Sequence, residues 1–149
     1  MKRVILVLSL IITSSVFSQK TDYNTQKGYI ASGYDVVSYF SNKAVKGSAK
    51  FIYTFEGASY KFSSKENLER FKSNAAKYVP QYGGYCAYAL GTSGEKVTIN
   101  PKTFEIRDGK LYLFYNSWGT NTLEMWQKED PEKLQKKADS NWLKIKFKS

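Results

Sequence analysis

The sequence predicts an α+β fold in which a small antiparallel sheet built from two hairpins is covered by three to four helices. Two segments alternate between apolar and polar residues around an X-Gly pair, and other segments space apolar residues at helical intervals. Hydrophobic residues make up 42% of the 149 residues and aromatic residues 16%, which is ample for a core. No internal repeat or low-complexity linker divides the chain, so a single domain is expected.

The first eighteen residues are typical of a secretory signal. Lys2 and Arg3 precede an apolar run over 4–12, and small residues precede a cleavage point expected after Ser18. The run is too short for a membrane-spanning helix, which needs roughly 20 residues. We therefore expect residues 1–18 to be removed, although an uncleaved N-terminal anchor is the alternative. The mature chain, with no transmembrane segment, is expected to be exported to the periplasm or secreted.

The first predicted hairpin spans residues 51–62, with a two-residue Glu-Gly turn at its centre. In this register one face is aromatic and the opposite face is mostly polar, as the alternation of side chains along a strand requires. The predicted aromatic pairs are Tyr53 with Tyr60 and Phe51 with Phe62.

The second predicted hairpin spans residues 104–115 around an Asp-Gly pair, which is a strong signal for a type I′ turn. The register again gives one shared apolar face. Its predicted pairs are Ile106 with Leu111 and Phe104 with Leu113.

Four helices are predicted between and after the hairpins: three from apolar residues at helical spacing, and a short one that follows Gly83-Gly84. The first starts with a capping box and ends before a proline, and the last starts with an aspartate N-cap followed by proline at the first helical position. The first helix starts at the capping box of Ser63 and Glu66, the second and third span 84–90 and 121–128, and the last starts at Asp130-Pro131.

The residue inventory excludes several kinds of chemistry. With one cysteine there is no internal disulfide, and with no histidine there is no Ser-His-Asp, Cys-His or His-cluster zinc site. No pair of carboxylates is placed for acid–base catalysis, and no glycine loop suits phosphate. The sequence therefore favours a binding protein over an enzyme.

The charge balance, 23 basic against 13 acidic residues, gives +10 and favours anionic partners such as lipid headgroups or polysaccharide of the cell envelope. Export makes a nucleic-acid partner improbable, and none is expected. The densest basic stretch is expected to form a solvated helix face followed by a tail: Lys133, Lys136, Lys137, Lys144, Lys146 and Lys148.

The segment around the only cysteine is the main candidate site. Gly83 and Gly84 allow a sharp turn or a close approach of the backbone. If a helix begins near Gly84, Cys86 lies in its first turn, where backbone N–H groups and the helix dipole favour a thiolate. Tyr82 and Tyr85 would line any pocket there. The alternative is that Cys86 is a small buried hydrophobic residue and that the tyrosines fill the core.

Six blocks of sequence, in this order, carry a resemblance to a known family: 33–40, 45–49, 55–62, 78–89, 108–113 and 138–142. Together they are similar to the YHS-domain family, in its exported stand-alone branch, and the resemblance covers residues 28–145. In that branch cysteine or selenocysteine occupies the position of Cys86, which implies redox or soft-metal chemistry. The wider family includes domains attached to heavy-metal transport ATPases, which implies metal handling.

The chain departs from the family pattern because it has no histidine and no second cysteine, so a zinc site with four protein ligands is not available. Copper(I) or another soft metal would need Cys86 together with Met125, a tyrosine or a second subunit. Met125 lies beside Trp126 in an amphipathic stretch, where packing in the core is the expected role.

Three hypotheses for function follow. The chain is a binding module for a soft metal or small ligand, or a redox thiol protein that needs an external thiol, or a structural or interaction domain with a basic surface. Asp35 could orient a group in the site or serve only in a turn. The predicted ligand-binding residues are Cys86, Tyr82, Gly83, Gly84, Tyr85 and Asp35, with Cys86 as the metal ligand and redox candidate.

Overall fold

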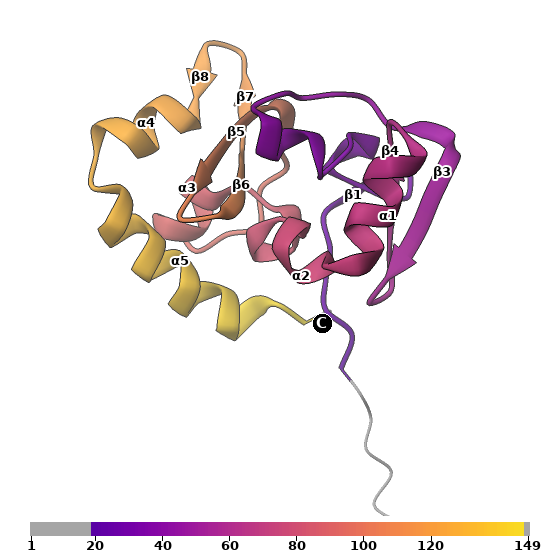
Figure 1. Cartoon of the computed structure of the whole chain (residues 1–149). Coiled ribbons are helices and arrows are strands. Elements are labelled where there is room, and N and C mark those ends of the chain that lie inside the picture. Colours follow the sequence, from indigo (N-terminus) through magenta and orange to yellow (C-terminus); the bar gives the residue numbers. More distant parts are fainter. Residues whose placement is uncertain (1–18, 148–149) are drawn as a thin grey trace, which may run out of the picture.

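A computed structural model describes residues 19–147, so the predicted signal segment lies outside the described residues. The chain has the predicted α+β fold, with helices and small sheets in both halves. Figure 1 shows the elements of the first half on one side of the molecule and those of the second half on the other. The two halves meet along the segment that contains Cys86.

The first half contains a four-stranded sheet in the order β1-β2-β4-β3. Its strands pair antiparallel, except that β2 runs parallel to β4. Two 3₁₀ helices, η1 (Ala31–Gly33) and η2 (Ser38–Ser41), connect β2 to β3. The strands are β1 (Thr25–Gln26), β2 (Tyr29–Ile30), β3 (Ser48–Phe55) and β4 (Ala58–Phe62).

The β3–β4 hairpin confirms one predicted aromatic pair and corrects the other. Tyr53 pairs with Tyr60 as expected. The predicted partner of Phe62, Phe51, is wrong: Phe62 pairs with Ser48, because the register of the ladder shifts between Ser48 and Ile52. Such an irregularity adds unpaired residues to one strand, and a pattern based on simple alternation does not contain it.

Helix α1 (Lys65–Ser73) packs on this sheet and is followed by α2 (Ala75–Tyr78). The N-cap of α1 is Ser64, not the predicted Ser63, and its hydroxyl accepts the Asn67 N–H at 3.1 Å. Phe71 of α1 is fully buried and packs against aromatic rings from both strands of the hairpin. These rings, with centroids 4.7–6.2 Å from that of Phe71, belong to Tyr53, Phe55, Tyr60 and Phe62.

The second half contains the predicted second hairpin, β5 (Asn100–Arg107) and β6 (Lys110–Phe114). The pairs Ile106–Leu111 and Phe104–Leu113 are confirmed. The two predicted hairpins were expected to build one sheet, but they lie in separate sheets. The free edge of β6 is occupied instead by the segment before α3, which forms single parallel bridges at Pro80–Leu111 and Cys86–Leu113.

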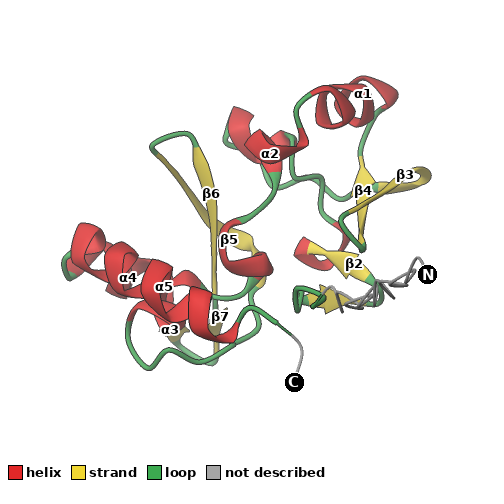
Figure 2. Cartoon of the chain, turned by 90° about the horizontal axis from the view of Figure 1, so that it is seen from below, coloured by secondary structure: helices red, strands yellow, loops and turns green. Residues whose placement is uncertain are grey.

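A short hairpin and three helices complete the second half, and Figure 2 shows α3, α4 and α5 grouped at one end of the molecule. The last helix begins as predicted, since the Asp130 side chain accepts the Lys133 N–H at 3.0 Å and Pro131 is the first helical residue. The elements are η3 (Gln81–Gly84), α3 (Ala87–Gly91), β7 (Asn116–Ser117), β8 (Thr120–Asn121), α4 (Thr122–Lys128) and α5 (Pro131–Ile145).

The core has two parts, and β6 lies between them. Leu111 and Leu113 belong to the cluster that includes the first-half sheet, whereas Tyr112 and Phe114 belong to a second cluster around Trp126. Because its side chains alternate between two apolar environments, β6 is buried on both faces. Among residues 19–147, no helix is both long enough and apolar enough to cross a membrane.

Candidate functional site

Cys86 lies at the centre of the molecule, with none of its surface exposed to solvent. It is the N-cap of α3, which begins one residue later and is only five residues long. The Cys86 N–H donates to the Val97 carbonyl at 2.9 Å. The short helix predicted over 84–90 is present as α3 but starts three residues later, because Gln81–Gly84 form a 3₁₀ turn and the chain is extended at Tyr85.

The sulfur of Cys86 belongs to a closed set of hydrogen bonds with two other residues. It accepts the Tyr115 N–H at 3.3 Å and lies 3.3 Å from Thr122 Oγ1. The Thr122 hydroxyl donates its single hydrogen to the Tyr115 carbonyl at 2.7 Å. The sulfur is therefore held between a backbone donor and the Thr122 hydroxyl.

The two tyrosines predicted to line a pocket around Cys86 point elsewhere. Tyr82 is buried and donates to Asp139 of α5 at 2.8 Å. Burial, followed by the hydrogen bond to Asp139, raises the pKa of Tyr82. The Tyr85 hydroxyl donates to Asp22 at 3.1 Å, and burial together with this bond raises the pKa of Tyr85 to about 12. Through these hydrogen bonds, Tyr82 joins the loop before α3 to α5, and Tyr85 joins it to the N-terminal segment.

The two predicted glycines have a packing role in the same loop. A Cβ atom at Gly83 would lie 2.8 Å from the Trp142 ring and 2.9 Å from the Asp22 carbonyl, and φ at Gly83 is +60°. The Gly84 carbonyl accepts the Asn24 side-chain amide at 2.9 Å. Glycine is needed at position 83 because two other segments meet the backbone there.

Asp35 is also fully buried, and its carboxylate is occupied by donors of the chain itself. One oxygen accepts the Val37 N–H at 2.9 Å and the Ser38 N–H at 3.4 Å. The other accepts the Ser63 N–H at 2.8 Å, the Ser63 hydroxyl at 2.6 Å and the Asn67 amide at 2.7 Å. Asp35 thus joins the loop before β3 to the end of β4 and the start of α1, and it does not lie with Cys86.

The described residues, 19–147, contain no group of three or more histidine, cysteine, aspartate or glutamate side chains that could hold a metal ion. Met125, the predicted additional ligand, is 38% exposed on α4, whereas Cys86 is fully buried. The core role expected for Met125 is therefore wrong, and the neighbouring Trp126 occupies the core.

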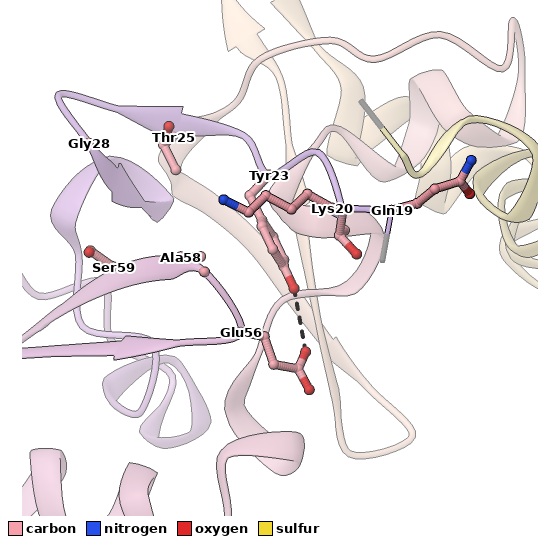
Figure 3. A pocket seen from close by; sticks show the side chains of 10 residues that line it. Gln19, Lys20, Tyr23, Thr25, Gly28, Glu56, Ala58 and Ser59 are labelled. Atoms are coloured by element: carbon pink, nitrogen blue, oxygen red, sulfur yellow. Dashed lines mark hydrogen bonds between the residues drawn. The ribbon is translucent and has the colours of Figure 1, made fainter. Parts of the chain in front are cut away.

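A hollow of about 520 Å³ lies between the N-terminal segment and the β3–β4 turn. Figure 3 shows Tyr23 on one side and Glu56 on the other, joined by a hydrogen bond of 3.4 Å. Burial and the negative charge of Glu56 raise the pKa of Tyr23. Sequence reasoning missed this hollow because its walls are 33 residues apart and meet only in the folded sheet.

The outer face of α5 carries exposed lysines without ion-pair partners in the described part of the chain: Lys133, Lys136, Lys137 and Lys144. One apolar side chain lies on the same face, Leu143, which is 66% exposed. Phe147 lies beyond the end of α5 and pairs with Thr21. The buried face of the helix carries Leu134 and Ala138. The basic stretch forms a helix face over residues 133–144, as predicted, but this face includes the exposed Leu143. Lys146 is the C-cap of α5, and Lys148 lies outside the described residues.

A second exposed feature is Trp118, at the tip of the β7–β8 hairpin, which is 97% exposed. Sequence reasoning missed this hairpin. The only local signal was the glycine that follows the tryptophan, since an X-Gly pair between polar residues permits a two-residue turn.

Comparisons of the chain with protein-family models, curated proteins and solved structures found no match. The resemblance to YHS domains therefore stays a prediction.

Proposed function

We propose that this chain is an exported, YHS-like interaction domain that docks on an anionic lipid surface through the outer face of α5. The supporting observation is the set of unpaired lysines on that face together with the exposed Leu143. This develops the hypothesis of an interaction domain with a basic surface, and it assigns Cys86 a place in the core.

The spacing along α5 places the cationic and apolar groups side by side. Leu143 and Lys136 are seven residues apart and so lie on the same line along the helix. Lys133 and Lys144 lie beside this line, toward the same flank. An exposed apolar side chain beside lysines on one helix face suits a helix that lies in a membrane interface.

The acidic residues of α5 offset part of this charge, because Glu132 and Asp139 are exposed and lie one turn from Lys136. Asp139 also accepts the hydrogen bond from Tyr82, and the four lysines outnumber the two carboxylates. Each lysine close to an anionic membrane contributes about 1 kcal/mol, so four contribute about 4 kcal/mol, roughly a thousandfold in binding. Partial burial of Leu143 in the interface adds to this.

The hypotheses of soft-metal binding and redox activity need a thiolate that solvent or a ligand can reach. Cys86 is fully buried, and its sulfur is engaged by Tyr115 and Thr122. The buried position of Cys86 therefore favours a structural role for this residue over the binding of copper(I) or of a small ligand.

Co-sedimentation with vesicles tests the proposal. The protein should bind vesicles that contain about one third anionic lipid, fail to bind neutral vesicles, and dissociate as salt is raised. Replacing Lys133, Lys136, Lys137 and Lys144 by glutamine should abolish this binding. Leu143→Ser should weaken it at constant charge.

A matched control removes the same charge from the other half of the molecule. Lys27, Lys43, Lys46 and Lys50 are also exposed and unpaired among the described residues. Their replacement by glutamine should leave most of the vesicle binding intact. Equal losses in both quadruple variants would show a response to net charge alone and would contradict a docking face on α5. Binding to a soluble sulfated polysaccharide, but not to vesicles, would assign the face to acidic polysaccharide instead.

A further inference from the structure

The β7–β8 hairpin presents a tryptophan to solvent in a conformation that tryptophan does not favour. Ser117 pairs with Thr120, so Trp118 and Gly119 form a two-residue turn with φ of +51° and +77°. A left-handed backbone costs an ordinary residue about 1 kcal/mol or more. No packing within the hairpin offsets this, because 97% of the Trp118 side chain is exposed.

Other X-Gly turns of the chain show what a purely structural tip looks like. Lys27, Glu56 and Asp108 each precede a glycine with the same signs of φ, and each is a charged, solvent-compatible residue. The corresponding position at the β7–β8 tip carries the bulkiest apolar side chain instead. A tip residue that is strained, apolar and exposed is expected when it contacts something outside the chain.

Two sets of contacts hold the base of this hairpin: Asn116 of β7 bonds to Asn100 and Thr103 of β5, and Cys86 joins the two ends. Tyr115 precedes β7 and Thr122 follows β8, and the sulfur contacts both. The Tyr115 carbonyl in turn accepts the Thr122 hydroxyl at 2.7 Å and the Thr122 N–H at 3.0 Å. The two ends of the hairpin are therefore fastened to each other and to the core, and Figure 1 shows the hairpin projecting from the body of the molecule.

The turn around Trp118 is polar and uncharged, and one acidic and one basic residue, Glu124 and Lys128, line the hollow beside it. Ser117 and Thr120 flank the turn, and within the described chain their hydroxyls make no hydrogen bond. A hollow of about 530 Å³ lies along β8 and α4, and another of about 410 Å³ lies along β5 and β7. The hairpin is thus a ridge with free hydroxyls and an aromatic ring at its tip.

We propose that the Trp118 tip binds a neutral carbohydrate chain and that Cys86 is the positioning residue for this tip. The C–H face of a pyranose ring packs on an indole ring, and hydroxyls beside the ring hydrogen-bond with those of the sugar. A bilayer fits less well, because inserting Trp118 would dehydrate Ser117 and Thr120 without new partners. Positions 116–122 carry no charged residue, and Glu124 and Lys128 in the neighbouring hollow have opposite charges, so the site favours a neutral ligand over an anionic one.

Titration with cellohexaose, chitohexaose and maltohexaose, followed by calorimetry and by tryptophan fluorescence, tests the tip. At least one of these sugars should bind, and Trp118→Ala should weaken its binding about tenfold or more, as for an aromatic residue at the centre of an interface. Trp118→Phe should lose less than Trp118→Ala. Trp118→Asn, which suits the turn, provides a folded variant without the ring.

The positioning role has its own variants. Cys86→Ser keeps a donor and an acceptor and should retain binding, whereas Cys86→Ala should weaken it. Thr122→Val, which keeps the shape and removes the hydroxyl, should weaken binding in the same way. In Cys86→Ala and Thr122→Val, amide hydrogen exchange should rise in residues 115–122 and stay unchanged in β3 and β4.

These results are separate from those expected for α5. The quadruple lysine variant of α5 should bind the sugar like the wild type, and Trp118→Ala should bind anionic vesicles like the wild type. If none of the three sugars binds, or if Trp118→Ala binds equally well, the carbohydrate proposal is overturned. Loss of vesicle binding in Trp118→Ala would overturn it in favour of a lipid contact. Unchanged exchange in residues 115–122 would overturn the role of Cys86.

Discussion

The β5–β6 and β7–β8 hairpins share a two-residue X-Gly turn with positive φ at both positions, but they are stabilised in different ways. Leu111 and Leu113 of β6 are fully buried, so the β5–β6 hairpin is held by apolar packing. The β7–β8 hairpin consists of two residue pairs, and its tip is exposed. It is attached at its base by hydrogen bonds, those around the Cys86 sulfur and those that join Asn116 of β7 to Asn100 and Thr103 of β5. One hairpin is therefore part of the core, and the other is a projection fastened at its base.

The largest effect is expected from the core hairpin. Leu113→Ala should lower the free energy of unfolding by about 2–5 kcal/mol, since it removes a fully buried side chain and leaves a cavity. Urea denaturation of both proteins measures the difference. Lys110→Ala, at an exposed position of the same strand, is the control and should change stability by less than about 0.5 kcal/mol. A loss below about 1 kcal/mol for Leu113→Ala would mean that β6 is not a core strand.

A smaller, local effect is expected from Cys86. Cys86→Ala leaves the Tyr115 N–H without its acceptor, which costs about 1–3 kcal/mol for a buried donor. Cys86→Ser restores a hydroxyl that accepts from Tyr115 and donates to Thr122, so it should be more stable than the alanine variant. Urea denaturation ranks the three proteins. Equal stability of the serine and alanine variants would show that the sulfur acts only through its volume.

Local signals were enough to predict much of the fold. The Asp-Gly turn fixed the β5–β6 register, and Asp130-Pro131 marked the start of α5. Both depend on residues that are close in sequence. The N-cap of α1 was misplaced by one residue because Ser63, a good N-cap by type, bonds instead to Asp35, 28 residues earlier.

The candidate site was harder to predict because its properties come from contacts between distant segments. Nothing near Cys86 in the sequence shows that Tyr115 and Thr122 engage its sulfur, 29 and 36 residues later. The neighbouring tyrosines were expected around the thiol, but Tyr82 bonds to Asp139 and Tyr85 to Asp22. The Trp118 turn was missed because tryptophan is not a residue that a type I′ turn favours.

The smallest effect, and the one of opposite sign, is expected at the tip of the projecting hairpin. Trp118→Asn should raise the free energy of unfolding by about 0.5–1 kcal/mol, because asparagine tolerates the left-handed conformation and the tryptophan ring makes no compensating contact. Asp108→Asn, in the matching turn of the core hairpin, is the control and should change stability little, since both residues suit that position. Thermal unfolding of the pair measures both changes. A destabilised Trp118→Asn variant would show that the ring packs on the protein in solution, whereas stabilisation would show that the chain keeps a less stable residue at this tip.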